Sequence, residues 1–73
     1  MNQNVLIHCN AEYLPEVKEL GLYYTINSQL DDEVDVKVPD IEYDRDGSIV
    51  ETDEQLCEYY GIDFDQVLHI ERI

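Results

Sequence analysis

The sequence predicts a small α+β domain with two short helices on one face of a mainly antiparallel sheet. Three observations lead to this prediction. The 73 residues suit a single domain, residues 1–73, with a small core. The apolar residues, 44% of the chain, follow strand-like and helix-like periods. The predicted elements run strand, helix, two or three strands, helix and strand, a reduced ferredoxin-like β-α-β-β-α-β order.

The first part of the chain predicts a strand, a short helix and a second strand. Residues 5–9 (VLIHC) form a β-rich run that is typical of a central strand buried on both faces. We expect a helix over residues 15–20, with proline at its first position and Gly21 as a left-handed terminator. The alternative for residues 11–20 is a loop with one turn of helix. Residues 22–26 (LYYTI) predict the next strand because aromatic and β-branched residues favour strands.

The middle of the chain contains the clearest strand pattern. Valines alternate with polar residues over residues 34–38. Pro39 cannot donate a hydrogen bond to a sheet, so it marks a bulge or an edge position. We expect the apolar face to resume over residues 41–43. A turn at residues 44–47 (DRDG) and a short returning strand at residues 48–50 should follow.

The last part of the chain predicts a helix and a closing strand. Thr52 and Gln55 fit a capping box, in which each side chain bonds the backbone of the other residue. The helix should end at Gly61, with Ile62 making the hydrophobic contact that accompanies such an end. Residues 66–73 then form a strand.

The charge of the chain is strongly negative and unevenly distributed. Eighteen acidic residues face four basic ones, which gives a net charge of −14. Residues 31–65 hold fourteen of the acidic residues and two of the basic ones. A concentrated negative field repels nucleic acid and anionic membranes, and it attracts cations and basic protein surfaces.

One stretch places an acidic residue at every second position. In a strand, side chains on one face lie about 6.8 Å apart. A protein surface that grips the regular phosphates of DNA with lysine and arginine would accept such a row of carboxylates. The alternative is an ordinary solvated face of an acidic domain. We call this row the acidic rail: Asp40, Glu42, Asp44 and Asp46.

In its size, its acidity and its lack of catalytic residues, the chain resembles the small DNA-mimic inhibitors encoded by phages and mobile elements. These include anti-restriction proteins, anti-CRISPR proteins and inhibitors of uracil-DNA glycosylase. The resemblance is one of class and rests on no shared motif. It implies a cytoplasmic inhibitor that binds a basic nucleic-acid-binding protein, with no direct binding of nucleic acid or membrane. The predicted partner-binding residues are Asp31, Asp32, Glu33, Asp35, Asp40, Glu42, Asp44, Asp46, Asp53, Glu54, Tyr43 and Tyr59.

Two other binding interpretations are weaker. Residues 42–53 resemble the twelve-residue EF-hand calcium loop, with carboxylates at positions 1, 3, 5 and 12 and glycine at position 6. Glu42 and Asp53 depart from the usual first and last residues, and a strand precedes the loop, so we favour a hairpin turn and a capped helix. The four candidate soft ligands match no zinc-motif spacing, and we predict no metal site or cofactor. They are His8, Cys9, Cys57 and His69.

The sequence favours a non-enzymatic protein. No serine or threonine lies in a glycine-flanked nucleophile elbow, and no phosphate-binding glycine loop is present. Two cysteines do not make a disulfide framework, and no signal-like or membrane-spanning run is visible, so we expect an intracellular protein with reduced thiols. A competing function is an interaction module that uses an apolar or tyrosine surface. Of the six tyrosines we expect about half in the core and half at the rim. Tyr24, Tyr43 and Tyr60 are candidates for the core, and Tyr13, Tyr23 and Tyr59 are candidates for exposure, but the sequence does not decide which are exposed.

Overall fold

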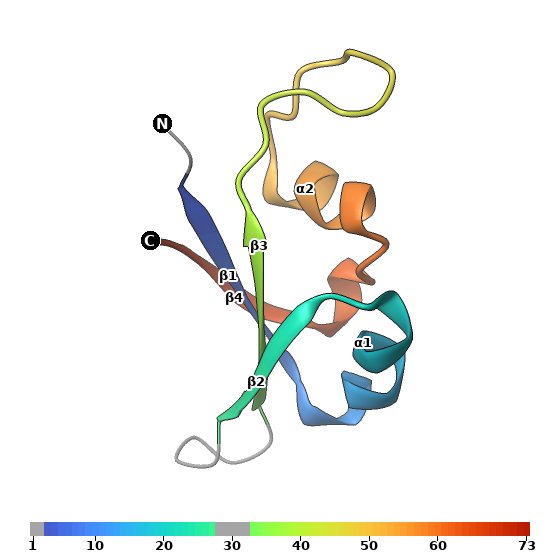
Figure 1. Cartoon of the computed structure of the whole chain (residues 1–73), viewed down its shortest axis with the longest axis vertical. Helices are drawn as coiled ribbons and strands as arrows, with labels where there is room; N and C mark the ends of the chain where they lie inside the picture. The colour runs from blue at the N-terminus through green and yellow to red at the C-terminus, as the bar shows by residue number, and fades with distance from the viewer. Residues whose placement is uncertain (1–2, 28–32) are drawn as a thin grey trace.

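The computed structural model describes residues 3–27 and 33–73 and contains a four-stranded antiparallel sheet with both α-helices on one face (Figure 1). The strand order is β2-β3-β1-β4, which confirms the predicted ferredoxin-like arrangement. The strands are β1 (Asn4–Asn10), β2 (Tyr23–Asn27), β3 (Glu33–Pro39) and β4 (Val67–Arg72). The helices are α1 (Leu14–Leu20) and α2 (Asp53–Tyr60), with 3-10 turns η1 (Ala11–Tyr13) and η2 (Phe64–Gln66).

The hydrophobic core lies between the sheet and the two helices. Strand β1 is central, as predicted, and pairs with β3 on one side and β4 on the other. Because side chains alternate along a strand, every second residue of β1 and β3 reaches this core. The buried core residues are Val5, Ile7, Cys9, Tyr13, Val17, Val34, Val36, Val38, Leu56, Cys57 and Ile62.

The helix ends follow the local signals in the sequence. Helix α1 begins one residue earlier than predicted, after η1, and ends at Gly21 with φ +72°. The capping box of α2 is present, because Thr52 and Gln55 each accept a backbone hydrogen bond from the other. Gly61 ends α2 with φ +79°, and the buried Ile62 donates a hydrogen bond to the carbonyl of Cys57 at 2.8 Å.

The prediction that the strand resumes after Pro39 is wrong. Strand β3 ends at Pro39, beyond the last β2 pairing at Lys37, so only β1 borders it there. Residues 40–52 form a loop beyond the end of the sheet (Figure 1), and the predicted return of residues 48–50 is reduced to a single bridge between Tyr43 and Ile49. The alternating pattern continues in sequence, but among the described residues no sheet strand lies beside it to pair with it.

The structure settles which tyrosines are exposed, and two differ from the candidates named from the sequence. Tyr13, the last residue of η1, is buried in the core, and its hydroxyl accepts a hydrogen bond from the Asp63 amide at 2.8 Å. Tyr43 is 59% exposed because the strand expected to carry it into the core does not form. Within the described ranges, neither helix has the length and apolar character required to cross a bilayer.

Candidate partner-binding surface

Most of the surface carboxylates lie in one continuous stretch of the chain. Residues 40–65 contain ten acidic residues and one basic residue, Arg45. We call this region the acidic lobe; it comprises the loop 40–52, α2, the turn after it and η2. The loop projects past the sheet, and α2 lies directly beneath it (Figure 1). All ten carboxylates are exposed or half-buried: Asp40, Glu42, Asp44, Asp46, Glu51, Asp53, Glu54, Glu58, Asp63 and Asp65.

The tip of the loop is a hairpin that its own side chains hold together. The Asp44 carboxylate accepts hydrogen bonds from the amides of Asp46 and Ser48, both at 2.9 Å. Gly47 supplies the positive φ of +84° that the turn requires. The favoured interpretation of residues 42–53, a hairpin turn followed by a capped helix, is confirmed. Asp44 Oδ1 accepts two backbone hydrogen bonds from within the segment, so residues 44–48 have the geometry of a closed turn.

The acidic start of α2 has a local explanation. Asp53 and Glu54 occupy its first turn, where the helix dipole favours negative charge. Arg72, on β4, lies 3.0 Å from Asp53 and 3.6 Å from Asp40. This arginine therefore connects the end of the sheet to the loop and to the helix. It neutralises part of the charge at the base of the acidic lobe.

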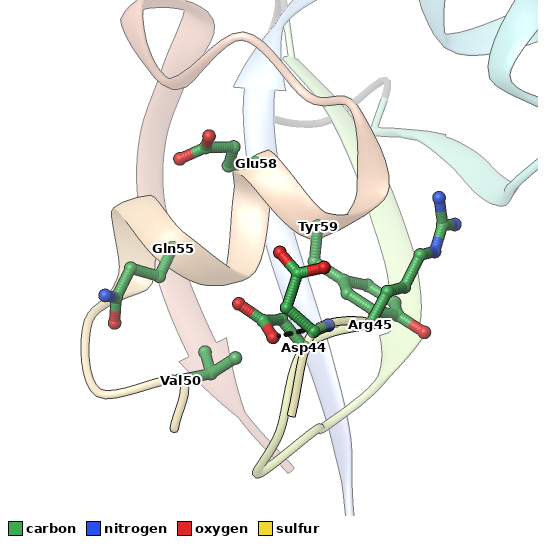
Figure 2. Close-up of a pocket in the computed structure, with 7 residues that line it drawn as sticks. Asp44, Arg45, Val50, Gln55, Glu58 and Tyr59 are labelled. Carbon is green, nitrogen blue, oxygen red and sulfur yellow. Dashed lines mark hydrogen bonds between the residues drawn. The ribbon is translucent and has the colours of Figure 1, made fainter. Parts of the chain in front are cut away.

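An open groove of about 270 Å³ separates the hairpin from α2 (Figure 2). The guanidinium carbon of Arg45 lies 5.0 Å from the centre of the Tyr59 ring, within the range of a cation–π interaction. The groove thus combines carboxylates with an aromatic face that holds a cation. Its lining residues are Asp44, Arg45, Asp46, Val50, Gln55, Glu58 and Tyr59.

The structure brings eight of the predicted partner-binding residues into the acidic lobe. Two others, Asp31 and Asp32, fall outside the described residues. Glu33 and Asp35 were expected on the surface but are buried on the sheet face away from the helices. The eight in the acidic lobe are Asp40, Glu42, Tyr43, Asp44, Asp46, Asp53, Glu54 and Tyr59.

The burial of Glu33 and Asp35 is explained by His8, which the sequence pattern did not connect with these two carboxylates. His8 pairs with Asp35 across β1 and β3, and with His69 across β1 and β4. Its Nδ1 atom lies 3.0 Å from Glu33 Oε2 and 2.8 Å from Asp35 Oδ1. The imidazole rings of His8 and His69 are stacked, with centroids 3.9 Å apart. A histidine in a strand predicted to be buried on both faces was the available signal, because such a residue needs polar partners.

The two thiols face the core rather than this histidine. Burial raises the pKa of Cys9 to about 12, helped by nearby Cys57 and by the carboxylates of Asp35 and Glu33. Burial also raises the pKa of Cys57 to about 11, with Asp53 contributing. Thiols that stay protonated at neutral pH are poor nucleophiles and poor metal ligands.

The phenol of Tyr60 is also perturbed. Its hydroxyl donates a hydrogen bond to the Pro39 carbonyl, which fastens α2 to the end of β3. Partial burial, with Tyr59 and Asp40 nearby, raises the pKa of Tyr60.

Comparisons of the chain with protein-family models, with curated proteins and with solved structures found no match.

Proposed function

We propose that this protein is a cytoplasmic inhibitor of the phage or mobile-element anti-defence kind, such as an anti-CRISPR or anti-restriction protein. It occupies a basic nucleic-acid-binding surface of a partner protein, and it performs no catalysis. The single observation that supports this proposal best is the acidic lobe. Ten accessible carboxylates within 26 consecutive residues, with one arginine among them, create a strong local negative potential.

The carboxylates of the acidic lobe are held by a constrained backbone. The Asp44 turn fixes the hairpin, the Thr52 capping box fixes the start of α2, and Arg72 joins loop, helix and sheet. A charge array that is already ordered loses less conformational entropy when a partner binds. This supports recognition by a particular surface, whereas a flexible acidic tail would favour any cation.

The mode of mimicry differs from the straight rail that the alternating sequence suggested. The four rail residues lie in a loop, so their carboxylates do not follow a regular strand spacing. Charge is instead shared between the hairpin and the exposed residues of α2. In the groove beside Tyr59, the contact with Arg45 indicates that this aromatic face accepts a guanidinium, so a partner's arginine would bind there by displacing Arg45.

A second candidate function is a non-catalytic interaction module. Tyr23, on β2, is 70% exposed, and Leu68 and Ile73, in or next to β4, are more than half exposed. A partner that binds these apolar side chains would be held mainly by the hydrophobic effect, so its association should be insensitive to salt. Salt dependence therefore separates the two functions.

The test is affinity capture from a nuclease-treated bacterial lysate, with elution by a salt gradient and identification by mass spectrometry. Nuclease treatment removes nucleic acid that could bridge two proteins. We expect a basic nucleic-acid-binding protein to be retained and then released as salt rises, because exposed charge pairs are screened. Retention that ignores salt, or that captures no basic protein, would contradict the proposal.

Two matched variants sharpen this test. Each neutralises three exposed glutamate or aspartate side chains, so both carry the same net charge. The lobe variant should release its partner at clearly lower salt than the wild-type protein, whereas the control variant should behave like wild type. Equal behaviour of the two variants would show that total charge, not the acidic lobe, governs binding. The lobe variant is Glu42→Gln, Asp46→Asn, Glu58→Gln, and the control is Glu12→Gln, Glu16→Gln, Glu19→Gln.

A further inference from the structure

A buried group of one imidazole and two carboxylates lies on the sheet face opposite the helices. His8, Glu33 and Asp35 are 6%, 6% and 8% exposed. They come from the two central strands, and cross-strand pairing places Asp35 directly beside His8. Paired strands hold backbone positions firmly, so the donors have a defined geometry. We call these three residues the His8 cluster.

The hydrogen bonds within the His8 cluster are incomplete. The Nδ1 atom of His8 has one position for a proton and bonds the carboxylate of Glu33 at 3.0 Å. Asp35 Oδ1 lies 2.8 Å from the same nitrogen, yet it is fully buried and has no hydrogen-bond partner among the residues that the structure describes. Buried carboxylate oxygens without a partner are costly, since they have lost hydration and gained nothing in return.

The charges of the His8 cluster are also unbalanced. When both carboxylates are ionised, the imidazole supplies at most one positive charge against two negative ones. No lysine or arginine of the described residues forms a salt bridge with Glu33 or Asp35. A buried excess of negative charge calls for a cation with more than one positive charge.

We propose that His8, Glu33 and Asp35 bind a divalent transition-metal ion, with Zn²⁺ as the best match. One imidazole nitrogen and two carboxylate oxygens are a ligand set that suits zinc, whereas calcium and magnesium prefer oxygen alone. Zinc in proteins is usually tetrahedral, and ligand atoms about 2.05 Å from a tetrahedral ion lie about 3.3 Å apart. Both carboxylate oxygens lie closer than that to His8 Nδ1, at 2.8 and 3.0 Å, so small side-chain rotations would admit the ion. The ion replaces the proton at Nδ1 and gives Asp35 Oδ1 the partner that it lacks.

His69 is assigned a supporting role rather than that of a ligand. His8, His69 and Glu71 also lie close enough to share an ion. However, the two rings are nearly parallel, with 15° between their planes. The lone pair of an imidazole nitrogen lies in its ring plane, so two stacked rings do not direct their lone pairs at one point. His69 covers the ring of His8, and Cys9, next in sequence, points to the opposite side of the sheet.

The first test separates a built site from general attraction of cations to an acidic protein. Zn²⁺ is titrated into the apo-protein in a large excess of Mg²⁺, which saturates loosely bound positions on the surface. We expect one equivalent of Zn²⁺ to bind and to raise the melting temperature, because the ion binds the folded state. Loss of Zn²⁺ binding in excess Mg²⁺ would overturn the proposal.

Matched variants locate the site. Asp35→Asn should weaken Zn²⁺ binding by at least about tenfold, while Asp46→Asn, the same chemical change at the exposed hairpin, should leave the affinity unchanged. Equal effects of the two changes would overturn the assignment. His69→Ala should retain Zn²⁺ binding; if it abolishes binding while Asp35→Asn does not, the ion belongs to the other group.

A measurement on the unaltered protein covers the case in which a variant fails to fold. The chain has two histidines, so long-range ¹H–¹⁵N spectra of the imidazole rings are simple to interpret. Zn²⁺ should convert His8 Nδ1 to a metal-bound nitrogen and leave both His69 nitrogens unbound. Zn²⁺-induced change at His69 alone would overturn the proposal.

Discussion

The raised thiol pKa values predict that the folded protein loses stability in mild alkali. Both thiols are fully buried in the core. Their pKa values rise from an ordinary value of 9.0 to about 12 for Cys9 and about 11 for Cys57. The folded state therefore keeps two protons that the unfolded chain releases above about pH 9. The stabilisation that comes from the raised thiol pKa values is complete below about pH 9 and is lost as the pH rises toward the folded-state pKa values of the two thiols.

The size of the effect follows from proton linkage. Between the unfolded-state and folded-state pKa values of a thiol, the free energy of unfolding falls by about 1.4 kcal/mol per pH unit for each proton that the folded state retains. Between about pH 8 and about pH 10 the two thiols together should remove about 2–3 kcal/mol. The free energy of unfolding of a native domain is typically about 5–15 kcal/mol, so this loss is a large share of the total.

Urea unfolding followed by circular dichroism at several pH values measures this loss. Cys9→Ala and Cys57→Ala should each remove about half of the pH dependence, whatever their stability at neutral pH. Tyr60→Phe is the control, because the raised pKa of that phenol acts in the same direction at higher pH. Equal pH slopes in the wild-type protein and both cysteine variants would refute the argument that the buried thiols resist ionisation.

Three further substitutions test the local contacts by urea unfolding. Thr52→Ala should cost about 1 kcal/mol through loss of the capping box, and Thr52→Ser should restore most of it. Tyr13→Phe should cost about 1 kcal/mol, because the Asp63 amide loses its acceptor; an unchanged midpoint would show that water replaces it. Gly61→Ala should destabilise more than Gly21→Ala, since both have positive φ but only at Gly61 would a Cβ meet Leu20, at 3.3 Å. Equal losses would indicate that Leu20 moves aside.

The parts of the fold that the sequence predicted correctly depend on local chemistry. The capping box at Thr52 and the glycines at positions 21 and 61 specify helix ends through bonds within a few residues. The valines of β3 specify which face is buried, because side chains alternate in any strand. These signals need no knowledge of the neighbouring strand.

The errors arise where long-range pairing decides the outcome. The alternation of residues 40–46 looks like a strand, but a strand also needs a partner, and past Pro39 the described part of the chain provides only the single bridge between Tyr43 and Ile49. The sequence did not predict the His8 cluster for the same reason: its residues are brought together by long-range strand pairing. Asp35 and His8 are 27 positions apart, and only the register between β1 and β3 places them side by side. Spacing rules for metal ligands along a sequence do not detect such a group.

The open sheet has a consequence for how copies of this protein behave in solution. In the described part of the chain, β2 and β4 form the two edges of the sheet, and each offers unpaired backbone groups to another strand. At neutral pH the charge of −14 makes copies repel one another before their edges can meet. Near the isoelectric point of about 4.1 that repulsion vanishes. Acidic charge thus protects the protein from self-association through its strand edges, and mild acid removes that protection.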